Sequence, residues 1–171
     1  MAVQRFTIEV SQLVLDDLGE RLDRLRWPDE VVLSALDAEA QPAGLPARWL
    51  RDLMQEWRDR FDWRAQERAL NDLPQVRIEV DGQLLHAVHV AGRGPNPLPL
   101  LLCHGWPSSF VEFTKVIPQL TDPASFGGSE ADAFTVVAPS LPGYLFSSPL
   151  AAGRSGDTVN LFARLMTELG P

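Results

Sequence analysis

The stretch 100–107 constrains the fold of this chain more than any other. Its apolar residues 100–103 stop abruptly at His104-Gly105-Trp106-Pro107, and a helical pattern begins just beyond that turn. A short continuous apolar run is typical of a buried strand in a parallel sheet. A turn at the carboxyl end of such a strand lies where open α/β sheets hold their ligands, and its backbone N–H groups can point at an anion. The sequence therefore predicts an anion-facing loop in an α/β protein.

Composition narrows the class of partner. Hydrophobic residues make up 45% of the 171 residues and charged residues 22%, as in a soluble globular protein with one core. The formal net charge of −8 is spread along the chain without a Lys/Arg cluster, so we expect no nucleic-acid partner. No run approaches the ~18 apolar residues of a membrane helix, so no membrane partner is expected either. The first residues lack a signal peptide's basic-then-apolar order, which makes a cytoplasmic location the expectation.

Residues 1–74 are predicted to form a mainly helical N-terminal part. An extended piece at 6–10 precedes Ser11, a candidate N-cap, and a helix to about residue 26 with leucines at helical spacing. An irregular connection is predicted for 31–45, and a second amphipathic helix begins near Pro46. Helical spacing predicts that the stripe of this second helix packs in a core; the stripe consists of Trp49, Leu50, Leu53, Met54, Trp57 and Phe61.

Residues 75–171 read as the start of a sheet covered by helices. Alternating strands flank Asp81-Gly82, a strong hairpin signal, and further strands follow at 100–103 and 134–138. One helix, capped by Ser108 or Ser109, is expected between these two strands, and its predicted inward face is Phe110, Phe113, Val116, Ile117 and Leu120. A last helix, capped by Asp157 or Thr158, ends at Gly170. The order predicts an antiparallel hairpin leading into a parallel, helix-covered sheet.

His104 is the histidine with the most informative position. It could be a general base, a metal ligand or a residue that shapes the turn. We favour the third, because Gly105 permits an unusual backbone conformation and Pro107 stiffens the backbone after it. The natural donor to a developing oxyanion is then the backbone N–H of Trp106. A purely structural turn remains the alternative.

Other reactive residues have ordinary explanations. His86 and His89 are three apart on a predicted strand, so they point to opposite faces and cannot share a metal. No metal-ligand spacing and no nucleotide-binding glycine pattern occurs, so no cofactor is expected. Asp157 lacks the second glycine of a nucleophile elbow, since Val159 occupies that position, and it reads as a helix cap. Cys103, the single cysteine, continues the apolar run and is expected to pack as a small hydrophobe.

Four motifs then occur in one order: Arg26-Trp27-Pro28-Asp29-Glu30; Phe61-Asp62-Trp63-Arg64 with Glu67 and Leu70-Asn71; His104-Gly105-Trp106-Pro107; and Ser140-Leu141-Pro142-Gly143-Tyr144. Together they resemble the N-terminal half of the microsomal-type epoxide hydrolases, which include the juvenile-hormone epoxide hydrolases. The resemblance covers essentially all of 1–171. It implies an N-terminal helical meander, residues 1–74, followed by a partial α/β-hydrolase core, residues 75–171.

The resemblance also implies a mechanism without a cofactor. An Asp nucleophile opens an apolar epoxide and forms an ester, a His-acid pair activates water, and two lid tyrosines protonate the epoxide oxygen. The family's oxyanion loop corresponds here to His104, Gly105, Trp106 and Pro107, with Trp106 as the backbone donor. The nucleophile, the lid tyrosines and the catalytic His and acid would all fall beyond residue 171. The expectation is thus a truncated enzyme that ends before its nucleophile strand and is inactive alone.

Two alternatives stay open. The chain could be a non-catalytic module that pairs with a separate C-terminal half or partner, or self-associates, because strand 100–103 would lack a neighbour. It could also belong to a related α/β-hydrolase that acts on esters; a Gly-x-Ser-x-Gly rather than a Gly-x-Asp-x-Gly motif downstream would indicate this. Finally, Leu145 stands where relatives commonly have glycine, which questions the shape of that loop.

Overall fold

The computed structural model describes residues 2–27, 46–150 and 156–170, so the connection predicted for 31–45 lies outside the described residues. The chain forms two compact units. The sheet unit comprises Met1–Ile8 and Glu67–Pro171, and the helical unit comprises Glu9–Gln66. The predicted division of the chain after residue 74 stays a prediction.

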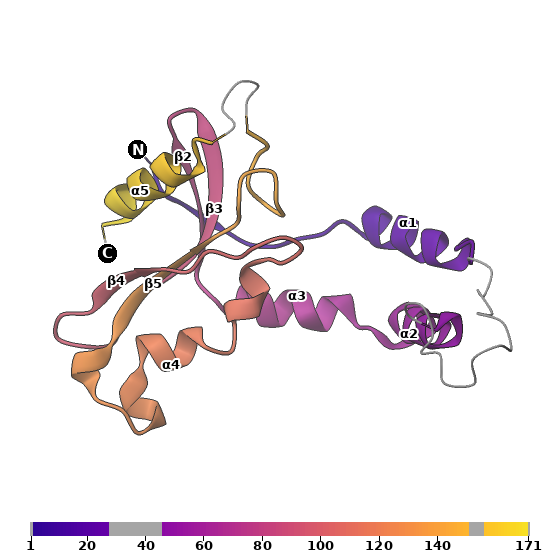
Figure 1. Cartoon of the computed structure of the whole chain (residues 1–171), viewed down its shortest axis with the longest axis horizontal. Helices are drawn as coiled ribbons and strands as arrows, with labels where there is room; N and C mark the ends of the chain where they lie inside the picture. The colour runs from indigo at the N-terminus through magenta and orange to yellow at the C-terminus, as the bar shows by residue number, and fades with distance from the viewer. Residues whose placement is uncertain (1, 28–45, 151–155, 171) are drawn as a thin grey trace, which may run out of the picture. The chain divides into compact units, whose positions relative to one another are not determined.

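The sheet unit is built on a five-stranded sheet with the order β1-β2-β3-β5-β4 (Figure 1). Its strands are β1 (Gln4–Phe6), β2 (Gln75–Val80), β3 (Gln83–Val90), β4 (Leu98–Leu101) and β5 (Phe134–Pro139). All neighbours pair antiparallel except β4 and β5, which pair parallel. The sheet thus changes from an antiparallel hairpin to a parallel pair, as the sequence predicted.

The β2–β3 hairpin confirms the turn signal. Asp81 and Gly82 both have positive φ, 51° and 76°, which matches the right-handed twist of the flanking strands. The first strand differs from its prediction, because the extended segment pairs with β2 at Gln4–Phe6 rather than starting at residue 6. Periodicity cannot show this, since the partner strand lies some 70 residues away in the sequence.

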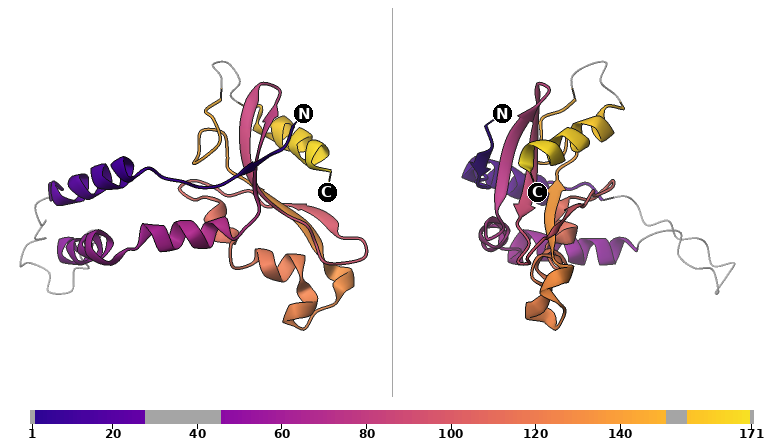
Figure 2. Two further views of the ribbon diagram at one scale, coloured as in Figure 1. Left: turned by 180° about the vertical axis from the view of Figure 1, so that it is seen from behind. Right: turned by 90° about the vertical axis from the view of Figure 1, so that its left-hand side faces the viewer.

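One face of the sheet is covered by α5 (Thr158–Leu169), which Figure 2 shows beside the β2–β3 hairpin. The predicted inward residues Leu161, Phe162 and Leu165 are buried, and Gly170 ends the helix with a φ of 58°. This confirms the last predicted helix. The core that it completes consists of Ile78, Val80, Leu85, Ala87, Val137, Leu161, Phe162 and Leu165.

The segment between β4 and β5 corrects the single predicted helix. It contains the 3₁₀ turn η1 (Phe110–Phe113), α4 (Ile117–Thr121) and two further 3₁₀ turns, η2 (Pro123–Phe126) and η3 (Glu130–Asp132). Ser109 does cap η1 by accepting a hydrogen bond from the Val111 N–H. The helix breaks because Pro118, in the first turn of α4, has no N–H to continue a preceding helix. Phe110 and Ile117 are buried as predicted, whereas Val116 is exposed.

β4 is the second correction. It spans Leu98–Leu101, two residues earlier than predicted, and none of its residues is buried. The reason is its position at the edge of the sheet, where β5 is its one neighbour among the described strands. Cys103, expected to be packed, is exposed for the same reason. Partial burial still raises the pKa of its thiol, which disfavours the reactive thiolate.

The helical unit contains α1 (Gln12–Asp23), α2 (Ala47–Arg60) and the start of α3 (Trp63–Asn71). Ser11 and Pro46 occupy the N-cap positions of α1 and α2, although the Ser11 side chain makes no capping hydrogen bond. The two helices are joined by a two-pronged ion pair, in which Arg58 donates to both carboxylate oxygens of Asp23 at 2.8 and 3.0 Å.

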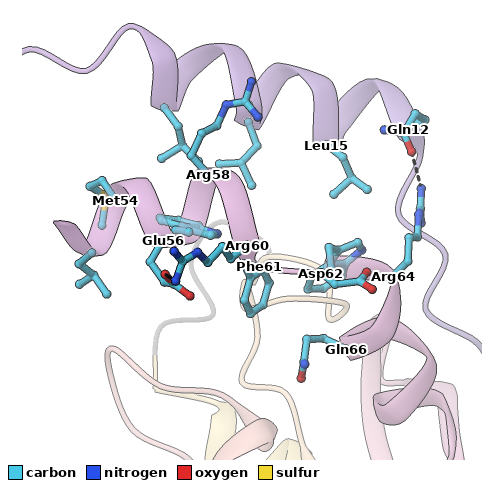
Figure 3. Close-up of a pocket in the computed structure, with 16 residues that line it drawn as sticks. Gln12, Leu15, Met54, Glu56, Arg58, Arg60, Phe61, Asp62, Arg64 and Gln66 are labelled. Carbon is cyan, nitrogen blue, oxygen red and sulfur yellow. Dashed lines mark hydrogen bonds and ion pairs between the residues drawn. The ribbon is translucent and has the colours of Figure 1, made fainter. Parts of the chain in front are cut away.

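The apolar stripe of α2 is not packed in a core, so that prediction was wrong. Trp49 is 55% exposed, Trp57 41% and Phe61 51%, and no residue of α2 is buried. Two helices bury only the seam between them, and helical spacing cannot tell a covered face from an open one. Instead part of the stripe lines an open groove of about 1090 Å³ together with Leu15, Leu18 and Leu22 of α1 (Figure 3); this part consists of Leu53, Met54, Trp57 and Phe61.

Hydrogen bonds explain several residues of the sequence motifs. The Asp62 carboxylate caps α3 by accepting from the Ala65 N–H at 2.9 Å. Arg64 holds the chain before α1 by donating to the Val10 carbonyl at 2.8 Å and to Gln12 at 3.2 Å. The Asn71 amide both donates to and accepts from the backbone of Ile8, at 2.8 Å each. These motif residues therefore fix local structure.

In the part of the chain that the structure describes, no helix is long and apolar enough to cross a bilayer.

Candidate active-site loop

The loop predicted to face an anion follows the carboxyl end of β4. The Leu102 N–H still donates to the Val137 carbonyl of β5 at 2.9 Å, and the chain turns immediately afterwards. The Ser108 N–H donates to the Gly105 carbonyl at 2.9 Å and closes the turn, which contains a cis peptide bond between Trp106 and Pro107.

Trp106 lies at the open side of this turn. Its side chain is 82% exposed. Among the described residues, its N–H has no hydrogen-bond acceptor. A backbone N–H without an acceptor in the protein is available to a ligand. In open α/β sheets, ligands bind beyond the carboxyl ends of the strands, which is where this N–H lies.

His104 holds the turn in place through hydrogen bonds of both ring nitrogens. It is 3% exposed, and its Nε2 accepts a hydrogen bond from the Leu141 N–H at 3.1 Å. Because that nitrogen is the acceptor, we assign the proton to Nδ1, which donates to the Gly105 carbonyl at 3.1 Å. The Tyr144 ring packs edge-on against the imidazole, with ring centroids 5.2 Å apart. Both ring nitrogens therefore hold backbone, and neither is free to act as a base in this arrangement.

The loop after β5 supplies the Leu141 amide. It is closed by hydrogen bonds from the Tyr144 N–H to the Leu141 carbonyl at 2.8 Å and from the Gly143 N–H to the Ser148 carbonyl at 3.0 Å. Leu145 has a φ of 46°, in the left-handed region that favours glycine. The doubt raised by this residue thus has a physical basis: the loop is formed, at a backbone cost of roughly 1–2 kcal/mol.

A buried hydrogen-bonded cluster around His86 was missed by sequence reasoning. His86 is fully buried on β3, and its Nδ1 lies 2.8 Å from the Ser140 Oγ at the end of β5. Its Nε2 lies 3.0 Å from the Gln75 Oε1 on β2. Its backbone N–H donates to the Ser147 Oγ at 2.9 Å, and Ser147 donates to the Ser140 carbonyl at 2.8 Å. The available signal was a histidine on a strand among apolar residues.

Burial and charge keep His86 neutral. Burial first, and the positive charge of Arg77 second, lower its pKa from 6.5 to about 4. The rings of Phe6, Phe110 and Phe146 surround it, with centroids 5.0 to 5.3 Å apart within this cluster. His89 lies outside the cluster, and burial also lowers its pKa. Within the described residues, no group of three or more His, Cys, Asp or Glu is placed to hold a metal ion.

Asp157 lies at the N-cap position of α5, as predicted, although its side chain makes no capping hydrogen bond. Near it, Arg164 donates to the Asp81 carboxylate at 2.6 Å and ties α5 to the hairpin turn. Asp157 and Asp81 therefore lie close to each other, beside α5 and the hairpin turn.

Comparison with known proteins defines the class first. Residues 99–171 match the family model described as alpha/beta hydrolase fold, in agreement with the parallel pair and the helix-covered sheet. Residues 3–113 match the model described as Epoxide hydrolase N terminus. The chain therefore belongs to the epoxide hydrolase family.

Particular relatives agree. Epoxide hydrolase 1 of Oryctolagus cuniculus is 37% identical over 99% of this chain, which covers 37% of that protein. The structure of Aspergillus niger epoxide hydrolase is similar with a TM-score of 0.83 and 29% identity, over 99% of this chain and 44% of that one. Juvenile hormone epoxide hydrolase from Bombyx mori is similar with a TM-score of 0.78 and 27% identity, over 99% and 39%. The chain thus spans less than half the length of these relatives.

Proposed function

We propose that this chain supplies the oxyanion-loop part of an epoxide hydrolase site, which hydrolyses an apolar epoxide to a vicinal diol without a cofactor. The observation that carries the proposal is the unused Trp106 N–H at the carboxyl end of β4, in a chain whose residues 3–113 match an epoxide hydrolase family model. The residues that attack the epoxide and activate water are expected in sequence that this chain does not contain.

The chemistry assigns Trp106 to the second of two steps. In the first, an aspartate carboxylate attacks an epoxide carbon, the C–O bond breaks, and the resulting alkoxide takes a proton from acids outside this chain. In the second, water activated by a base adds to the ester carbonyl and places a negative charge on its oxygen. The Trp106 N–H would donate to that oxyanion until the intermediate collapses to diol and carboxylate. His104, Gly105 and Pro107 would hold the donor in place.

A chimera tests this proposal. Residues 1–170 would be joined to the part of Aspergillus niger epoxide hydrolase that follows the matched region, with the junction placed by structural superposition. We expect the folded chimera to convert an apolar epoxide to its diol, and a variant lacking the nucleophilic aspartate of the joined part to be inactive. A chimera that melts cooperatively but forms no diol would contradict the proposal.

We propose pairing of this chain through β4 as a second, non-catalytic function. β4 is the edge of the described sheet. The Leu98 and Leu102 N–H groups donate to Ala133, just before β5, and to Val137 of β5. By alternation the Leu101 N–H points outward, while Pro99 has no N–H. An edge with a free donor favours pairing with a second copy.

The cytoplasmic location expected from the sequence stays a prediction.

Light scattering over a range of concentrations tests this pairing. We expect a dimer that the substitution Leu101→Pro converts to monomer, because proline removes the outward N–H and leaves the bonds to β5 intact. A concentration-independent monomer of the unaltered chain would argue against pairing.

A further inference from the structure

The buried His86 cluster and the Trp106 loop are connected by hydrogen bonds between residues that are adjacent in the chain. The side-chain Oε1 of Gln75 lies 3.0 Å from His86 Nε2, and the Ser140 hydroxyl lies 2.8 Å from His86 Nδ1. Ser140 directly precedes Leu141, whose N–H binds His104 at 3.1 Å. His104 in turn binds the Gly105 carbonyl at 3.1 Å, one residue before Trp106.

The protons of this chain of bonds have one consistent assignment. The Gln75 Nε2 donates to the Leu70 carbonyl at 2.9 Å, which orients the Gln75 oxygen toward His86. His86 must therefore carry its proton on Nε2 and accept the Ser140 hydroxyl proton at Nδ1. His104 has the opposite tautomer, with its proton on Nδ1. The two imidazoles are thus held in opposite tautomers by partners that leave no choice.

The cluster also fixes the position of the loop that carries the Leu141 amide. The His86 carbonyl accepts from the Ser140 N–H at 2.9 Å, and the His86 N–H donates to Ser147 at the other end of the loop. One buried residue of β3 therefore holds both ends of the segment 140–147. Just beyond this segment, Ser148 is hydrogen-bonded to Leu84 and Gln83 of β3.

From these contacts we propose that His86 is a positioning residue for the Trp106 loop: through Ser140 it fixes the Leu141 amide, and so the His104 ring and the Trp106 N–H. Trp106 as the oxyanion donor rests on the proposed function, but the physical connection from His86 to the loop does not. His86 is fully buried, so the proposed role acts through Ser140 and not through direct contact with a substrate.

Two substitutions separate positioning from stability. In His86→Asn, the side-chain oxygen lies near the former Nδ1 and can accept from Ser140, but it cannot reach Gln75. In His86→Gln, the longer side chain can reach toward Gln75, but it cannot serve Ser140 in the same geometry. Both remove the buried imidazole and both cost packing, so they form a matched pair. His89→Asn, on the same strand and outside the cluster, is the control.

The readout is the ¹⁵N–¹H spectrum of the 171-residue chain. In His86→Gln we expect the backbone amide signals of Leu141, Gly105 and Trp106 to move and the Nδ1 proton of His104 to exchange faster. We expect His86→Asn to restore these signals toward their original positions, and His89→Asn to leave them unchanged. Equal shifts in the Asn and Gln variants, or shifts confined to residues that touch position 86, would overturn the proposal.

A measurement on the unaltered chain keeps the proposal testable if either variant fails to fold. Long-range ¹⁵N–¹H correlations of the imidazoles should show the proton on Nε2 of His86 and on Nδ1 of His104 at pH 7. The reverse tautomer at either ring would break the connection and overturn the proposal. An inactive chimera together with the expected amide shifts would remove the proposed function and leave the positioning role standing.

Discussion

Acidification from pH 6.5 to pH 4 is expected to lower the free energy of unfolding by about 3 kcal/mol through His86 alone. The folded protein holds the pKa of this imidazole at about 4, whereas the unfolded chain has the ordinary value of 6.5. Between these pH values the unfolded state binds a proton that the folded state does not bind, so the free energy of unfolding falls as the pH falls. Well above pH 6.5 neither state is protonated, and well below pH 4 the loss is complete.

Urea unfolding at pH 7, 6, 5 and 4.5 measures this loss. Arg77 is the charged group that acts on His86, and its charge does not change in this range. His86→Asn should flatten the pH dependence in this window, whereas His89→Asn should leave most of it. The account of a buried neutral His86 fails if the unaltered chain and His86→Asn lose stability in parallel.

Removing the Trp106 backbone donor should reduce the rate of diol formation by the chimera about 10²–10³-fold, the effect of losing one oxyanion donor in comparable enzymes. Trp106→Pro removes the N–H, and Trp106→Ala keeps it while removing the same exposed indole. We therefore expect a large loss of kcat in Trp106→Pro and a small one in Trp106→Ala. The melting temperatures of both variants control for folding.

The pair separates the two roles that a tryptophan can have at this position. Equal losses in both variants would assign the effect to the indole, for example in binding an apolar substrate. No loss in Trp106→Pro would show that the loop does not stabilise the oxyanion. Either result would rule out the donor role of the Trp106 N–H.

The parts of the fold that the sequence predicts correctly depend on local signals. The turn at Asp81-Gly82 needs two residues of positive φ, which these residue types adopt readily. Helix α5 has its apolar residues at helical spacing and ends at a left-handed glycine. β5 is a short apolar run that is covered on both faces. In each case the cause lies within a few residues of the effect.

The incorrect predictions concern partners that lie far away in the sequence. Burial of β4 depends on a second neighbouring strand, and burial of the apolar stripe of α2 depends on a layer that covers it. Periodicity shows neither the neighbouring strand nor the covering layer. The break before α4 is the exception, because Pro118 was visible in the sequence.

The sequence locates the candidate loop because a strand end, a glycine and a proline coincide there. It does not show which residues hold the loop in place. His104 contacts Leu141, 37 residues away, and His86 contacts Ser140, 54 residues away. A single sequence gives no sign of such pairs. The structure adds the reason for a buried histidine at each position, namely a backbone or hydroxyl group that needs a partner inside the protein.

The central claim is that this chain carries the oxyanion loop but not the groups that open the epoxide. The most direct test is diol formation by the purified 171-residue chain, with the chimera assayed beside it as the positive control. We predict diol from the chimera and none from the chain above the level of a variant with the loop 104–107 deleted. Diol formation by the chain itself, lost on deletion of that loop, would contradict the claim.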